Sequence, residues 1–145
     1  CEIQIGLSGS IKENEKPNDA INREVKEELG LEINDINFLK KIGNVYFYDI
    51  QIKNDNYQIN YKKENKNHKD IRQKVSSLIH GKLSDLISVI NKSNLPYHFN
   101  ETISQICLVP IDLSIDILET LLNNKCNRIH SKGCRLYHFT QKEIE

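Results

Sequence analysis

The chain has 145 residues, enough for one domain with a modest core. Hydrophobic residues make up 38% and charged residues 28%, and 20 basic residues balance 20 acidic ones, so overall charge selects no partner. No apolar run reaches the ~20 residues that a membrane span needs, and no signal peptide is evident. We therefore expect no membrane partner, a cytoplasmic or nuclear location and four cysteines without disulfides, while the oligomeric state stays open.

The N-terminal part of the chain predicts a strand followed by a helix. Residues 2–7 have the pattern of a strand, and a loop is expected at residues 8–10, Ser-Gly-Ser. Asn18 or Asp19 can cap a helix, because a short polar side chain accepts a hydrogen bond from the free N–H groups of the first turn. Gly30 favours the left-handed conformation that commonly ends a helix, so we expect the helix to end just before it.

One face of this helix is apolar. Ile21, Val25 and Leu29 recur at i, i+4 and i+8, which predicts a stripe buried against the core. Residues 36–61 then change to a β pattern rich in Val, Ile, Tyr and Phe, interrupted by a polar turn at 54–56. The first half of the chain therefore predicts a helix followed by strands.

The next segment combines a basic run with apolar residues at helical spacing. Residues 62–70 predict a loop whose lysines could contact phosphates, although a solvated linker explains each lysine equally well. The lysines considered for substrate binding are Lys62, Lys63 and Lys66. The apolar residues that follow are Ile71, Val75, Leu78, Ile79, Leu86, Ile87 and Ile90. Their spacing predicts one long helix or two shorter ones near residues 70–92, with Gly81 at the kink.

The C-terminal part predicts a strand at 103–111, a helix capped by Ser114 and ending at Leu122, and an irregular tail from residue 123. Four residues of the tail recur at four-residue intervals and suit tetrahedral zinc. They are Cys126, His130, Cys134 and His138. Their spacing differs from that of the usual paired zinc loops, so ordinary tail residues are the alternative.

A group of carboxylates stands out on the predicted helix. Glu24, Glu27 and Glu28 are spaced i, i+3 and i+4, which places them on one side of the helix. Like charges this close destabilise a helix unless a cation neutralises them, and carboxylate oxygens favour Mg²⁺ or Mn²⁺. Arg23 can hold one carboxylate, and Glu15 can fold back towards the group. The alternative is a solvated acidic face.

The wider pattern favours the metal site. Residues from Gly9 to Leu31 fit Gly-x5-Glu-x7-Arg-Glu-U-x-Glu-Glu-x-Gly-U at every specified position, where U is a bulky aliphatic residue. This segment closely resembles the box of the Nudix hydrolases. The resemblance implies an α/β/α sandwich with a mixed sheet, in which the box forms the catalytic loop–helix–loop. It also implies Mg²⁺- or Mn²⁺-dependent hydrolysis of a nucleoside diphosphate linked to another group.

The resemblance assigns roles by matching position. The metal ligands would be Glu24, Glu27 and Glu28. Glu27, Glu28 and Arg23 would be catalytic, with Arg23 orienting the carboxylates, while Ser8, Gly9 and Glu15 would support the site. The backbone carbonyl of Ser8 could be a further ligand. Relatives usually have Pro-Gly-Gly where this chain has Leu7-Ser8-Gly9, so the loop conformation here is open.

Two further departures from the family concern chain length. Relatives have several strands before the box, whereas only eight residues precede Gly9, so we expect a single domain over residues 1–145 that lacks N-terminal strands. The segment at about 62–98 is longer than a minimal Nudix domain needs. We expect it to contribute a helical insertion near 70–92 that helps to select the substrate.

The substrate is the least determined feature. Glu101 opens the late strand, and several Nudix enzymes, including RNA decapping ones, place a general base or extra metal ligand at a comparable position. Together with the basic segment and with Lys12 and Glu13 in the box, it favours RNA 5′-cap hydrolysis. Nucleotide sugars, dinucleoside polyphosphates and oxidised nucleotides stay open. A non-catalytic Nudix-like module that binds a nucleotide or RNA is the alternative from another class.

Overall fold

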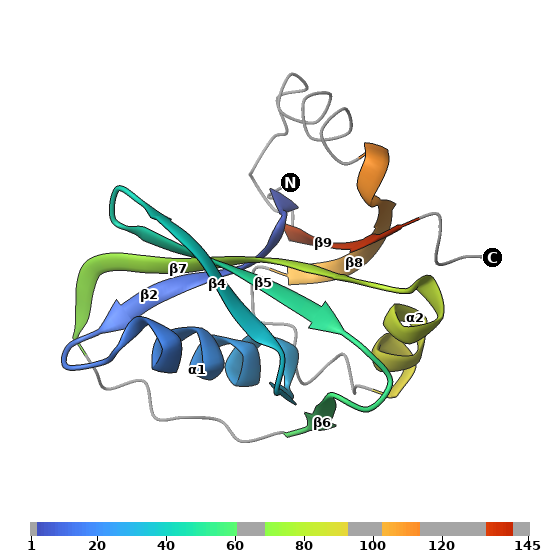
Figure 1. Ribbon diagram of the computed structural model, residues 1–145, viewed down its shortest axis with the longest axis horizontal. Helices are drawn as coiled ribbons and strands as arrows, with labels where there is room; N and C mark the ends of the chain where they lie inside the picture. Colours follow the sequence, from blue (N-terminus) through green and yellow to red (C-terminus); the bar gives the residue numbers. More distant parts are fainter. Residues whose placement is uncertain (1–2, 61–68, 93–102, 114–132, 141–145) are drawn as a thin grey trace.

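The computed structural model describes residues 3–60, 69–92, 103–113 and 133–140, and the structural statements below concern these ranges. It has a mixed β-sheet with helix α1 (Pro17–Leu29) against one face and helix α2 (Leu83–Lys92) near one end (Figure 1). The mixed α/β fold expected from the sequence is thereby confirmed. No described helix is long and apolar enough to cross a membrane.

The sheet combines parallel and antiparallel pairs. Its strands are β1 (Ile3–Gln4), β2 (Gly6–Lys12), β4 (Ile36–Ile42), β5 (Val45–Ile52), β7 (Asp70–Gly81), β8 (Ile103–Pro110) and β9 (Gly133–Phe139). The order is β1-β9-β7-β5-β4, with β2 also on β7 and β8 also on β9. β2–β7 and β4–β5 are antiparallel, whereas β5–β7, β7–β9, β8–β9 and β1–β9 are parallel. Strands β3 (Leu31–Ile33) and β6 (Tyr57–Ile59) form a separate antiparallel pair.

Helix α1 is positioned by its apolar stripe. Ile21, Val25 and Leu29 are each at most 3% exposed, which confirms the predicted buried face. They join a core that includes side chains from β2, β5 and β7. Burial of such aliphatic side chains contributes about 1.5–3 kcal/mol each, so this stripe fixes the helix against the sheet.

The C-terminal end of α1 agrees with the sequence prediction, whereas the N-terminal end does not. Gly30 has φ 66°, and its N–H donates to the Lys26 carbonyl at 3.1 Å, as expected for a left-handed C-cap. The predicted cap at Asn18 or Asp19 is wrong. The helix begins at Pro17, whose ring fixes φ at the first helical position, and Lys16 precedes it without a side-chain cap bond. Asn18 instead accepts a hydrogen bond from the Tyr48 hydroxyl at 2.6 Å.

The helical insertion predicted near 70–92 is wrong in its first half. Residues 70–81 form strand β7 within the sheet, and only Leu83–Lys92 is helical. The reason is geometric: a spacing of four places residues on one face of a helix, but it also places them on one face of a strand, where side chains alternate. Val75 and Ile79 are buried, and so is Ser77 between them. Residues 70–81 are therefore part of the sheet and not of a helical insertion.

Two other predicted irregular segments are strands. Ser8, Gly9 and Ser10 were expected to form a loop but lie within β2, where they pair with Ser76, Val75 and Lys74 of β7. The tail predicted from residue 123 contains β9, which joins β7, β8 and β1. Both errors have one source, because each segment acquires its β conformation from a partner that is distant in sequence. The helix predicted from Ser114 lies outside the described residues.

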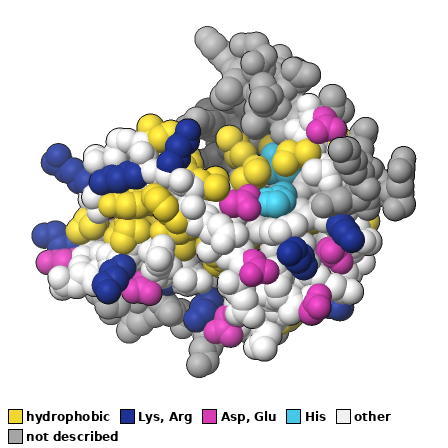
Figure 2. Space-filling view, in the orientation of Figure 1, with side chains coloured by type: hydrophobic (Ala, Val, Ile, Leu, Met, Phe, Trp, Pro, Cys, Tyr) yellow, Lys and Arg dark blue, Asp and Glu magenta, His cyan; other side chains and the backbone are white. Residues whose placement is uncertain are grey.

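Strand β4 forms one edge of the sheet and carries exposed apolar side chains. Phe38, Leu39 and Ile42 are 52%, 60% and 54% exposed. Figure 2 shows an apolar area flanked by basic side chains over this part of the molecule. The antiparallel pairing of β4 with β5 and the turn before β6 confirm the β pattern predicted for residues 36–61.

Candidate active site

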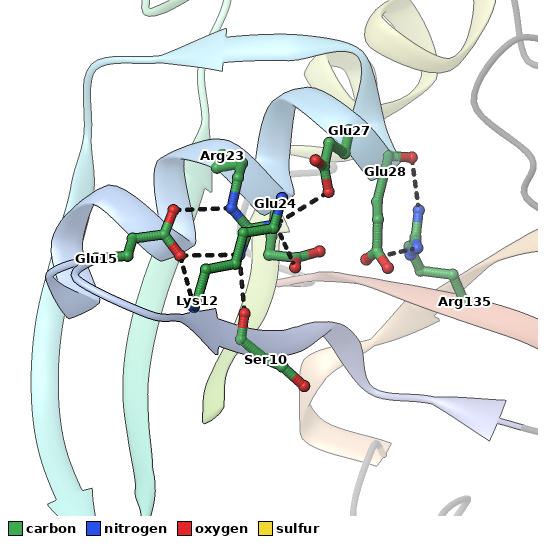
Figure 3. Close-up of polar contacts among 8 residues, drawn as sticks. All are labelled: Ser10, Lys12, Glu15, Arg23, Glu24, Glu27, Glu28 and Arg135. Carbon is green, nitrogen blue, oxygen red and sulfur yellow. Dashed lines mark hydrogen bonds and ion pairs between the residues drawn. The ribbon is translucent and has the colours of Figure 1, made fainter. Parts of the chain in front are cut away.

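The three glutamates of α1 lie along the side of the helix that borders β2 and β9 (Figure 3). Glu24 is 7% exposed, and its carboxyl group lies directly over Gly9 of β2. A Cβ atom at position 9 would overlap the Glu24 side chain, so glycine is required here for close approach rather than for an unusual backbone angle. Gly9 thus leaves the space that the Glu24 side chain occupies.

Arg23 is the centre of the hydrogen-bond network. Its Nε and Nη2 donate to Glu15 at 2.8 and 3.0 Å, and Nη1 donates to Glu24 at 2.8 Å and to Glu27 at 3.1 Å. Nη2 also donates to the carbonyl of Ser10 at 2.8 Å. One planar guanidinium therefore fixes three carboxylates against the end of β2, as expected from the fork geometry of arginine.

Glu28 has a different partner, Arg135 of β9. Arg135 is 2% exposed, and its Nη2 donates to Glu28 Oε2 at 3.2 Å while Nη1 donates to the Glu28 carbonyl at 3.1 Å. Sequence reasoning missed this residue. The signal in the sequence is weak: Arg135 is a basic residue at alternate positions from the apolar Tyr137 and Phe139, within a segment predicted to be irregular.

The pKa values of the carboxyls reflect the balance between burial and these partners. Burial raises the pKa of Glu28 to about 7; Arg135 opposes this increase and the charges of Glu24 and Glu27 add to it. Burial also raises the pKa of Glu24 in spite of Arg23. For Glu15 burial acts in the same direction, but hydrogen bonds from Arg23 and from the Lys12 N–H keep its pKa below 4.5.

This arrangement fits a divalent cation in two respects. Four carboxylates contact two guanidinium groups, so the network holds more acid than base. In addition, Glu27 Oε1 is buried and has no hydrogen-bond partner among the described residues. Hard oxygen ligands of this kind favour Mg²⁺ or Mn²⁺. Among the described residues, no three carboxylate, imidazole or thiol groups are already placed to bind one metal ion. Each glutamate of α1 instead points towards an arginine.

The remaining predicted residues are distributed as follows. Ser8 lies in β2 with an exposed side chain, and Glu15 follows the strand and faces Arg23. Several predicted residues lie outside the described ranges: Lys62, Lys63, Lys66, Glu101, Cys126 and His130. His138 is fully buried, and its Nε2 lies 2.8 Å from the Ile5 carbonyl, so this histidine has a structural partner. Cys107, half-buried on β8, is a free thiol.

Comparison with known proteins bears on the family alone. The family model for the NUDIX domain matches residues 5–78, which include β2, α1 and most of β7. Comparison with curated proteins and with solved structures gives no match. Nudix hydrolases act on nucleoside diphosphate derivatives and generally use divalent metals such as Mg²⁺. With a match over half of the chain and an intact box on β2 and α1, this protein belongs to the Nudix family.

Proposed function

We propose that the chain is a Mg²⁺- or Mn²⁺-dependent hydrolase that cleaves the diphosphate bond of a nucleoside diphosphate linked to another group. The observation that carries the proposal is the arrangement of Glu24, Glu27 and Glu28. All three lie along one side of α1, and the buried Glu27 Oε1 lacks a partner among the described residues. A solvated acidic face would not bury Glu24 to 7% exposure.

Some residues of the box would bind the cation, and others orient the carboxylates that bind it. Glu24, Glu27 and Glu28 would hold the cation, with the Ser8 carbonyl as a further candidate ligand. Such an ion, when bound, supplies a water nucleophile near neutral pH and neutralises charge on the phosphate oxygens. Arg23 keeps the carboxylates of Glu24 and Glu27 in fixed directions through bonds of 2.8 and 3.1 Å. Gly9 leaves the space that the Glu24 carboxyl occupies.

Glu101 is the proposed general base. The attacking water must lose a proton, and carboxylates that hold a cation are poor acceptors for it. A carboxylate from outside the helix can take this role, and in the sequence Glu101 lies two residues before Ile103, the first residue of β8. Strand β8 runs from Ile103 to Pro110 and is parallel to β9, which carries the Glu28 partner Arg135. General-base catalysis contributes about 10²–10⁴-fold in rate.

Capped RNA is the proposed substrate within this class. Support comes from sequence features: Lys12 and Glu13 in the box, Glu101, and the basic residues Lys62, Lys63 and Lys66. Lys12 is the last residue of β2, and its backbone N–H donates to Glu15 at 3.1 Å. Of these residues, Lys12 therefore lies next to the carboxylate network. A phosphate backbone is a suitable partner for lysines, which neutralise its charge.

A substrate screen tests the proposal. The purified chain is incubated with Mg²⁺ or Mn²⁺ and with capped RNA, ADP-ribose, dinucleoside polyphosphates or nucleoside triphosphates, and products are separated by chromatography. We expect hydrolysis between phosphates of at least one substrate, with capped RNA preferred, and none in EDTA. A folded chain that binds a nucleotide or capped RNA but hydrolyses no substrate would favour the non-catalytic binding module. Retention of every box glutamate argues against that module.

A further inference from the structure

Arg135 lies outside both the box and the matched residues 5–78. It is carried by β9, on which side chains alternate between the two faces of the sheet. Tyr137 and Phe139, at alternate positions from Arg135, belong to the hydrophobic core. Arg135 shares this face and is only 2% exposed. It needs a specific partner, because a buried guanidinium without one is strongly unfavourable.

Glu28 of α1 is such a partner, and Arg135 contacts it twice. Glu28 lies in the last turn of the helix, where the carbonyl groups have no N–H donor within the helix and can accept hydrogen bonds from elsewhere. Arg135 donates from Nη1 to this carbonyl at 3.1 Å and from Nη2 to the carboxylate at 3.2 Å (Figure 3). Because one rigid planar group holds both the backbone and the side chain of Glu28, it restricts the direction in which the carboxylate points.

We propose that Arg135 is a positioning residue that sets the orientation of the Glu28 carboxylate towards the divalent cation. The inference rests on the proposed function. The described contacts divide the carboxylates between two arginines: Arg23 holds Glu15, Glu24 and Glu27, and Arg135 holds Glu28. Strand β9 therefore completes a site whose other residues come from β2, α1 and the turn between them. A purely structural link between β9 and the helix would need only the bond to the carbonyl.

The test uses Arg135→Lys, which keeps the charge and loses the planar fork. Mn²⁺ affinity is measured by electron paramagnetic resonance of the free ion, a readout that requires no substrate. Loss of a partner that orients a metal ligand typically weakens affinity or activity about 10–100-fold, and we expect the Mn²⁺ dissociation constant to rise in that range. Arg72→Lys is the matched control, since Arg72 is exposed on β7 of the same sheet, and its affinity should equal that of the parent.

A second measurement separates orientation from packing. The melting temperature without metal is compared for the parent, Arg135→Lys, Glu28→Gln and the double variant. If Arg135 acts on the carboxylate, the Lys substitution lowers the melting temperature less in the Glu28→Gln background, where that contact is already weakened. Equal losses in both backgrounds would show that the guanidinium does not act through the Glu28 carboxylate and would overturn the proposal. If Arg135→Lys does not fold, Arg135→Gln, which keeps a planar donor, takes its place in both measurements.

The outcomes distinguish this inference from the proposed function. A parent chain that binds Mn²⁺, together with a folded Arg135→Lys variant of unchanged affinity, would overturn the role of Arg135 and leave the proposed function standing. A folded parent chain that binds no Mn²⁺ would overturn both. Weaker Mn²⁺ binding by Arg135→Lys with normal binding by Arg72→Lys supports both.

Discussion

Two buried arginines hold the glutamates of α1, and they do so in different ways. Arg23 belongs to the box, makes five hydrogen bonds and reaches residues that are close to it in sequence. Arg135 comes from β9 and donates two bonds to Glu28. The comparison shows that three of the four carboxylates are held by an arginine of the same contiguous motif, whereas the fourth depends on how distant strands meet in the sheet.

The largest expected effect comes from the carboxylate that Arg135 holds. Glu28→Gln keeps the side-chain shape and removes the charge, so we expect it to abolish turnover while the fold stays intact. Glu32→Gln is the control, because Glu32 forms a partly exposed ion pair with Lys26 at 3.1 Å and pairs near the surface contribute about 0–1 kcal/mol. Hydrolysis and circular dichroism are measured on both variants. Near-normal metal-dependent turnover by Glu28→Gln would contradict the assignment of Glu28.

The next largest effect is expected at Glu101, the proposed general base. If it is the general base, Glu101→Gln should lower kcat by about 10²–10⁴-fold with little change in KM, because the interaction is made in the transition state. Higher pH should partly restore the rate as hydroxide becomes available. Steady-state kinetics across pH check this. A kcat reduced by less than about threefold, well below the general-base range, would mark Glu101 as a surface residue.

The two arginines should also differ in their contribution to stability. Arg23→Met leaves three carboxylates without their shared partner, and removal of one member of a buried ion pair costs about 3–5 kcal/mol. Arg135→Met removes the arginine partner of one carboxylate, Glu28, and should cost less, because the raised pKa of Glu28 lets it become neutral. Urea unfolding in EDTA measures both free energies. An equal or greater loss at Arg135 would contradict the ranking.

The contrast between the two arginines also shows what the sequence could and could not predict. The helix and its carboxylate side follow from spacing within a few turns, so Glu24, Glu27, Glu28 and the Gly30 cap were predictable. Strand β7 was not, because Ile71, Val75 and Ile79 satisfy the helical and the extended period equally. Arg135 was missed for a related reason: its role exists only after β9 pairs in the sheet, and no local pattern specifies that pairing.

The smallest expected effect concerns the other buried polar residue of β9, His138. Burial lowers the pKa of His138 below 6.5; the Ile5 carbonyl opposes this, and nearby His80, which is paired with Asp49 at 2.7 Å, adds to it. The unfolded chain therefore takes up a proton near pH 6.5 that the folded chain does not. Stability should fall as pH decreases below 6.5, by up to about 1.4 kcal/mol per pH unit.

His138→Gln tests this pH dependence, because glutamine can still donate to the Ile5 carbonyl but does not titrate in this range. The free energy of unfolding is measured between pH 5 and 7.5 for the parent and the variant. The parent curve should be the steeper of the two on the acidic side. Parallel curves would show that His138 is protonated as readily in the folded chain as in the unfolded one.

The measurement that tests the central claim most directly is Mn²⁺ binding to the carboxylates of α1. Bound and free Mn²⁺ are distinguished by electron paramagnetic resonance for the parent chain, for Glu24→Gln, Glu27→Gln and Glu28→Gln, and for the control Glu32→Gln. If the three glutamates are the ligands, the parent and the control bind Mn²⁺ with equal affinity and each of the other variants binds it more weakly. Binding that is absent from the folded parent, or that is unchanged in all three variants, would contradict the claim.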